Sequence, residues 1–126
     1  MPVSPSFKAF VLEQLGAVEP VTARAMFGGV GVYAGGSFFA ILDDDRVYFK
    51  VDDATRPRYL AAGMGPFDPF RNGEQVMKGY HELPGEVLED EEALAVWMRE
   101  ALAVARRAKR PGAMAGMKAG TKPRRP

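Results

Sequence analysis

Histidine, cysteine and clustered carboxylates carry much of the catalysis and metal binding in proteins, and this chain offers few of them. It has one histidine, His81, and no cysteine. Glu82 follows His81 directly, and neighbouring side chains of a strand point to opposite faces, so the two make a poor metal site. We expect His81 to be a structural histidine at the rim or edge of the core. The sequence therefore predicts neither a metal site nor a cofactor.

A serine nucleophile would need His81 as its general base. Ser4 and Ser6 begin a predicted helix, and Ser37 lies in a predicted turn. None of these serines has the glycine-flanked turn from strand to helix that exposes a nucleophile. We therefore predict that the protein is not an enzyme.

Gly28, Gly29 and Gly31 form a segment that could in principle receive a phosphate. A phosphate loop needs GxxxxGK[ST], and a dinucleotide site needs GxGxxG between a strand and a helix. Here the glycines lie between two predicted strands, without a helix N-terminus to face an anion. We interpret them as turn or bulge residues that need a positive φ angle.

Two charged segments have simple structural interpretations. Asp43, Asp44 and Asp45 lack the spacing and the closing glutamate of a calcium loop, so we expect a solvated hairpin turn. Lys50 and Asp52 lie at a predicted strand end without a further chemical partner in the sequence. We expect exposed charges at both positions.

Short turns between apolar segments predict an α+β fold with an antiparallel meander, because a parallel crossover needs a dozen or more residues. A first helix is expected from Ser4, a good N-cap followed by Pro5, to Gly16. A middle helix is expected at about 54–62. The predicted strands cover 24–27, 30–33, 38–42, 46–50 and 75–80, with a short one near 67–70.

A long C-terminal helix is the clearest element, and all three helices are expected to pack on the sheet. Asp90 caps the helix, acidic residues occupy its first turn and basic residues its last, as the helix dipole favours. Its apolar stripe consists of Leu94, Trp97, Met98, Ala101 and Ala105.

The net charge of +1 conceals an acidic body and a basic end. Eight of the 17 basic residues and none of the 16 acidic ones lie from Arg106 onward, so residues 1–105 carry a net charge of −7. The basic residues are Arg106, Arg107, Lys109, Arg110, Lys118, Lys122, Arg124 and Arg125. We expect a domain at 1–109 and a disordered basic tail at 110–126, because the tail has too little apolar surface to order itself.

The tail has two interpretations that the residues leave open. It could bind a nucleic acid or an acidic partner through a salt-dependent charge interaction. It could equally be a solubilising extension. No aromatic residue of the tail is available to stack on a base.

The beginning of the chain lacks the basic start and apolar run of a signal peptide, and no segment approaches the ~18 apolar residues of a membrane span. The absence of cysteine fits a reducing compartment. We therefore expect a cytoplasmic protein without a membrane partner.

Several segments together resemble the N-terminal domain of the TfoX/Sxy family. They include an Arg-x-Met-Phe-Gly-Gly segment, a Gly-x-x-Phe-Ala strand, a Tyr-Phe-Lys-x-Asp strand end and a Tyr-x-x-x-Pro segment. The residues chosen as the family motif are Arg24, Met26, Phe27, Gly28, Gly29, Gly31, Tyr33, Phe49, Lys50, Tyr80 and Trp97. The similarity covers about residues 5–108.

The resemblance implies an α+β fold of the YgaC/TfoX-N type, similar to secretion chaperones. It also implies a transcriptional co-regulator of competence that acts with the cAMP receptor protein. Full-length members carry a second, helical domain, where this chain has its tail. The motif consists of core and turn residue types, so it explains a fold better than an activity.

The leading hypothesis is a non-enzymatic regulatory domain that works through contacts with another protein. The alternatives are a nucleic-acid-associated protein that uses its tail, and a small-ligand-binding domain, which would need a pocket with converging polar groups. An exposed sheet edge could also pair two copies into a homodimer.

Overall fold

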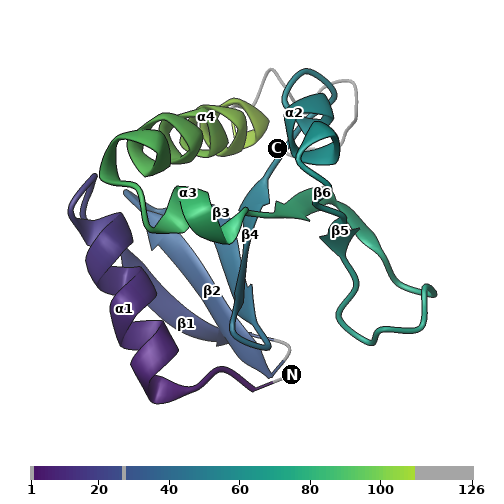
Figure 1. The fold of residues 1–126 in the computed structure, drawn as a ribbon, viewed down its shortest axis with the longest axis horizontal. Coiled ribbons are helices and arrows are strands. Elements are labelled where there is room, and N and C mark those ends of the chain that lie inside the picture. Colours follow the sequence, from purple (N-terminus) through teal and green to yellow (C-terminus); the bar gives the residue numbers. More distant parts are fainter. Residues whose placement is uncertain (1, 27, 110–126) are drawn as a thin grey trace.

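The structure, a computed structural model, describes residues 2–26 and 28–109. In this part of the chain, a six-stranded antiparallel sheet has the order β1-β2-β3-β4-β6-β5 (Figure 1). The expected α+β class is confirmed. The elements are α1 (Pro5–Gly16), β1 (Thr22–Met26), β2 (Gly29–Ala34), β3 (Ser37–Asp43), β4 (Arg46–Lys50), α2 (Arg56–Ala61), β5 (Pro66–Phe67), β6 (Met77–Glu82), α3 (Gly85–Leu88) and α4 (Glu91–Lys109).

The helices α1, α3 and α4 lie on the same side of the sheet (Figure 1). The core between them and the strands includes Leu15 of α1, Leu88 of α3 and Met98 of α4. Tyr59 brings α2 into the same core and is 1 % exposed. The molecule therefore has one layer of helices on one face of a sheet.

The first helix begins and ends where the sequence predicts. The hydroxyl of Ser4 accepts a hydrogen bond from the Phe7 amide at 3.3 Å, and Pro5 takes the first helical position. Val11 is completely buried. Phe10 is 39 % exposed and so lies outside the buried face.

Two tight turns hold the meander together. Gly35 and Gly36, between β2 and β3, have φ angles of 56° and 80°. Asp44 and Asp45, between β3 and β4, have φ angles of 53° and 55°. Positive φ at both central residues is what a two-residue type I′ hairpin requires. The solvated turn expected at 43–45 is wrong for Asp43, which is 2 % exposed and lies 4.0 Å from the Arg71 guanidinium.

The glycine interpretation is only partly right. Gly28 has a φ of 79°, as a turn requires, whereas Gly29 and Gly31 do not adopt positive φ. A Cβ atom on Gly29 would lie 2.2 Å from the carbonyl oxygen of Leu42. A Cβ atom on Gly31 would lie 3.0 Å from the Met26 side chain. Gly29 is therefore needed because a backbone atom of β3 approaches it closely, whereas the contact at Gly31 is with the flexible end of the Met26 side chain.

The segments after β4 depart most from the sequence prediction. The strand β6 covers Met77–Glu82 and so lies two residues later than the expected 75–80. It pairs with β4 through Tyr80 opposite Lys50 and Glu82 opposite Tyr48. The strand β5 is shorter than expected. The short helix α3 was not predicted at all, and Leu88 anchors it in the core.

The helix α4 confirms the Asp90 cap, whose carboxylate accepts hydrogen bonds from the amides of Glu92 and Ala93, both at 3.1 Å. The predicted stripe is buried except at Trp97, which is only partly buried. The Trp97 ring meets Tyr59 of α2 edge-on, with centroids 4.8 Å apart. Trp97 therefore joins α4 to α2 at the border of the core.

Candidate functional site

The sheet has a second face, turned away from the helices, which we call the outer face. Val32 and Ala34 of β2 and Phe49 of β4 belong to the core beneath the helices. Successive side chains of a strand point to opposite faces. Tyr33 and Lys50 therefore belong to the outer face.

Three aromatic rings cross the outer face and form what we call the aromatic row: Tyr33, Phe38 and Tyr80. The rings of Tyr33 and Phe38 stack with centroids 5.1 Å apart, and those of Phe38 and Tyr80 are tilted at 5.4 Å. The guanidinium of Arg24 lies 5.5 Å from the Tyr33 centroid. The ammonium of Lys50 lies 5.0 Å from the Tyr80 centroid. A cation thus flanks the row at each end.

The outer face is closed on the side of β5. Ile41, Tyr48, Phe67 and Tyr80 form a second, smaller buried cluster there. The Phe67 ring packs on Tyr48 with centroids 4.8 Å apart. Tyr33 and Phe38, farther from β5, remain partly exposed. The accessible part of the outer face therefore lies around these two rings.

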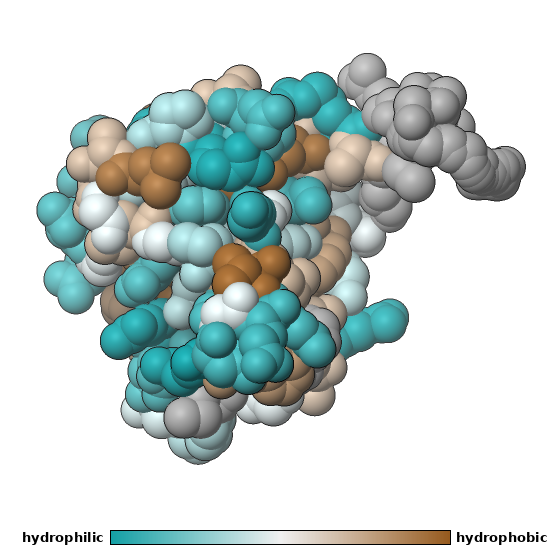
Figure 2. All heavy atoms as spheres, turned by 90° about the vertical axis from the view of Figure 1, so that its right-hand side faces the viewer, coloured by the Kyte–Doolittle hydropathy of each residue, from teal (hydrophilic) through white to brown (hydrophobic). Residues whose placement is uncertain are grey.

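The side of the molecule that carries α2 and the β5–β6 connection presents no broad apolar patch in its described residues. Figure 2 shows apolar side chains there as separate groups among hydrophilic ones. The large exposed apolar residues of this part of the chain, Leu60 and Phe70, come from different segments. Scattered apolar residues of this kind are normal for a surface.

Lys50 lies at the junction of two hollows beside the C-terminal end of α4. One, of about 340 Å³, we call the Lys50 hollow; its lining consists of Tyr33, Gly36, Phe38, Lys50, Tyr80, Ala105 and Ala108. The other has about 410 Å³ and shares Lys50 and Ala108 with the first. Burial lowers the pKa of the Lys50 ammonium. The expectation of an exposed charge is therefore wrong, because Lys50 is only partly exposed between the aromatic row and α4.

Within the described residues, no carboxylate lies within 4.0 Å of the Lys50 ammonium. Asp52, two positions along the chain, accepts hydrogen bonds from Arg107 at 2.7 Å and from the Thr55 amide at 3.0 Å. Burial pushes the pKa of Asp52 upward, but these hydrogen bonds outweigh it and lower the pKa. Asp52 is therefore engaged by other groups.

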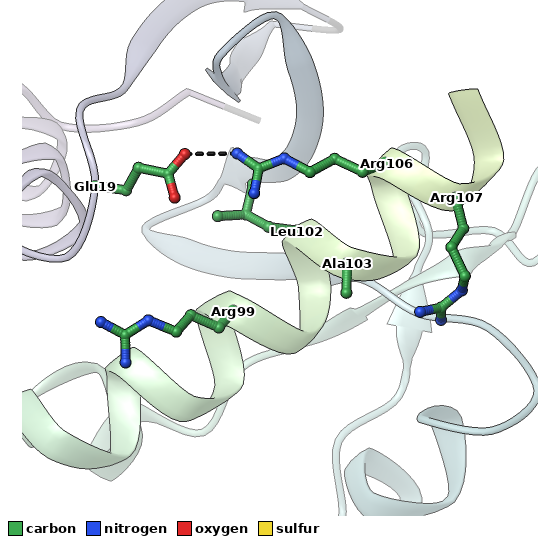
Figure 3. A pocket seen from close by; sticks show the side chains of 6 residues that line it. All are labelled: Glu19, Arg99, Leu102, Ala103, Arg106 and Arg107. Atoms are coloured by element: carbon green, nitrogen blue, oxygen red, sulfur yellow. Dashed lines mark hydrogen bonds and ion pairs between the residues drawn. The ribbon is translucent and has the colours of Figure 1, made fainter. Parts of the chain in front are cut away.

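Two of the eight basic residues assigned to the C-terminal end are bound to the body. Arg106 pairs with Glu19 at 2.5 Å, across a hollow of about 480 Å³ beside α4. Figure 3 shows Arg99 and Arg106 pointing to the side of Glu19, whereas Arg107 points away from it. The side chain of Lys109 and all of residues 110–126 lie outside the described part, so their predicted binding role stays a prediction.

Six of the predicted motif residues come together on or beside the outer face: Arg24, Met26, Gly31, Tyr33, Lys50 and Tyr80. Phe49 and Trp97 lie on the helical side instead. Gly28 lies in the turn between β1 and β2, and Gly29 begins β2. Phe27 lies outside the described residues. The sequence prediction missed Phe38, the centre of the aromatic row. The irregular register at Val32 and Tyr33 determines which of two successive phenylalanines faces outward, and no local pattern shows it.

Comparison with protein families identifies the family of the chain. The family model of the TfoX N-terminal domain matches residues 13–105. The chain belongs to the TfoX N-terminal domain family. No curated protein matches the chain. The resemblance seen in the sequence is thus confirmed, and the TfoX N-terminal domain family is not a known enzyme family.

The described residues of this TfoX N-terminal domain hold no group of three or more metal-binding side chains. His81 is 2 % exposed, and its Nδ1 atom lies 3.0 Å from the carbonyl oxygen of Met64. His81 is therefore buried and does not lie at a rim, and its expected structural role stays a prediction. Within the same ranges, no helix is both long and apolar enough to cross a membrane.

The Lys50→Met variant should be at least as stable as the wild-type domain at pH 7. Burial opposes the charged form, so the folded state has the lower pKa and the unfolded state binds more protons. The free energy of unfolding of the wild type, taken relative to that of Lys50→Met, should therefore rise as the pH increases through the folded-state pKa toward 10.5. The comparison with the variant is needed because the buried tyrosines Tyr48, Tyr59 and Tyr80, whose pKa values are raised, lower the stability of both proteins near pH 10. Urea unfolding from pH 7 to 10.5 measures this, and a loss above about 1 kcal/mol in the variant at pH 7 would contradict it.

Proposed function

We propose that this TfoX N-terminal domain is a non-enzymatic regulatory module that binds another protein through the accessible part of its outer face. The observation that carries this proposal is the aromatic row with its flanking cations. Tyr33 and Phe38 expose part of their rings, and Arg24 and Met26 lie beside them. Aromatic residues, methionine and arginine are the types enriched in the centres of protein interfaces.

A protein partner fits this surface better than a nucleic acid does. Residues 1–105 carry a net charge of −7, which repels a polyanion. Arg106 and Arg107 are neutralised by carboxylates of the same domain. Among the described residues, Arg24 and Lys50 supply local charge at the aromatic row, too few for a phosphate track.

The family resemblance suggests where to look for the partner. We propose that the partner protein belongs to the cytoplasmic transcription machinery, with the cAMP receptor protein as the first candidate. The two sheet edges, β1 and β5, are separate from the aromatic row except at Arg24. Pairing of two copies through an edge therefore stays a prediction beside this proposal.

A capture experiment with matched variants tests the proposed surface. The Arg24→Glu/Tyr33→Ala variant changes the outer face, and the Arg99→Glu/Phe70→Ala variant makes the same kinds of change elsewhere. Arg99 lies on α4, and Phe70 is 57 % exposed between β5 and β6. Each protein would serve as bait for purified cAMP receptor protein and for cell lysate after crosslinking.

We expect the outer-face variant to lose at least 90 % of the captured partner, because losing a central interface residue costs about 2 kcal/mol or more. The control variant should capture as much as the wild type. Equal capture by all three proteins, or no partner retained by the wild type, would refute the proposed surface. Circular dichroism of each bait checks that the fold is intact.

A further inference from the structure

The Lys50 hollow contains a cation whose counter-ion the described fold does not supply. Five arginines of this domain, namely Arg56, Arg58, Arg71, Arg106 and Arg107, form ion pairs with carboxylates. The Lys50 ammonium instead contacts the face of the Tyr80 ring. Its nearest acidic neighbour in sequence, Asp52, is already bound to Arg107 and Thr55. The ammonium therefore keeps hydrogen-bond donors for a group from outside.

The surroundings of this ammonium favour a particular kind of anion. Phe38 and Tyr33 form one wall of the hollow, and Ala105 and Ala108 of α4 contribute further apolar lining. A bare inorganic anion would leave these apolar walls without a contact. A carboxylate attached to an aromatic or branched apolar group would satisfy both the charge and the walls.

We propose that the Lys50 hollow receives an acidic residue of the partner protein, next to an apolar side chain that packs on the aromatic row. This inference rests on the proposed protein-binding function and names the chemistry of the partner segment. The acidic charge of residues 1–105 opposes a polynucleotide at the same place. One carboxylate needs only one local cation, and Lys50 provides it.

Model dipeptides test the proposal without a known partner. The probe is acetyl-Asp-Phe-amide, and its matched control is acetyl-Asn-Phe-amide, which has the same shape but no charge. Nuclear magnetic resonance titration of the full chain would follow the amide signals of Gly36, Phe38, Tyr80 and Ala108. We expect saturable shifts with the acidic peptide and roughly tenfold weaker binding of the amide peptide, the size of one charge-assisted contact.

Substitutions of Lys50 test whether its ammonium is the group that binds the acidic peptide. Lys50→Met should weaken binding of the acidic peptide roughly tenfold, and Lys50→Arg should retain most of it. Lys78→Met, which removes an exposed charge from β6, should leave binding unchanged. Equal binding of the two peptides, full binding by Lys50→Met, or no saturable shift would overturn the proposal.

A titration with an eight-residue oligothymidylate tests whether the partner is a nucleic acid and not a protein. Saturable, Lys50-dependent shifts with this oligonucleotide but not with the acidic peptide would assign the hollow to a nucleic acid and overturn the proposal. If the peptides fail while capture still depends on Arg24 and Tyr33, the protein-binding function stands and only the acidic-residue inference is lost. If the acidic peptide binds but no partner is captured, the Lys50 hollow still binds a carboxylate and the proposed protein-binding function is rejected.

Discussion

The Gly29→Ala variant is expected to lose about 3 kcal/mol of unfolding free energy, the upper part of the range for overpacked sites. The added Cβ atom would lie 2.2 Å from the carbonyl oxygen of Leu42, and no backbone atom of a paired strand can yield without breaking the β2–β3 register. The cause is steric crowding, because Gly29 does not have a positive φ angle. Urea unfolding followed by circular dichroism measures the loss.

Gly16→Ala is the matched control, since the same added atom at the end of α1 would meet no atom within 4 Å. Its free energy of unfolding should equal that of the wild type or exceed it by up to about 1 kcal/mol, because alanine at a compatible helical position loses less conformational entropy on folding than glycine does. A Gly29→Ala variant as stable as this control would show that β2 and β3 lie farther apart than the structure places them.

Phe49→Ala should cost about 4 kcal/mol, because removing a buried phenyl ring loses its transfer free energy and leaves a cavity. Phe49 is completely buried in the centre of the sheet, and its ring lies 5.7 Å from that of Phe39. It also pairs with His81 of β6, so its loss weakens the contact between the meander and the last strands. Chemical unfolding at pH 7 measures the change.

Phe70→Ala makes the same chemical change at a position that is 57 % exposed. This variant should unfold within about 0.5 kcal/mol of the wild type. If Phe49→Ala and Phe70→Ala lost similar amounts, Phe49 could not be the core residue that the structure describes.

Local features of this fold were predictable from sequence because their causes are local. Ser4 and Asp90 cap their helices through hydrogen bonds to amides two or three positions along the chain. The glycine pair at Gly35 and Gly36 gives the positive φ angles of a tight hairpin. The residues that make these interactions lie within a few positions of each other, so the sequence alone indicates them.

The candidate site depends on pairings between distant segments, which the sequence does not display. Lys50 meets Tyr80 only because β6 pairs with β4 and skips β5 in the order of the sheet. Phe38 faces outward because the β2–β3 register shifts beside Tyr33. Residue types alone predict an exposed charge at Lys50, because the aromatic row and α4, which enclose it, come together only in the tertiary structure.

The way in which the sheet closes has a consequence for when the Lys50 hollow exists. The pairs β2–β3 and β3–β4 join chain neighbours through two-residue turns, so they form with little loop-closure entropy. The β4–β6 pair must instead close a long loop that contains α2 and β5. Because Tyr80 reaches Lys50 only through that pairing, the Lys50 hollow is complete only in chains whose β6 is paired with β4.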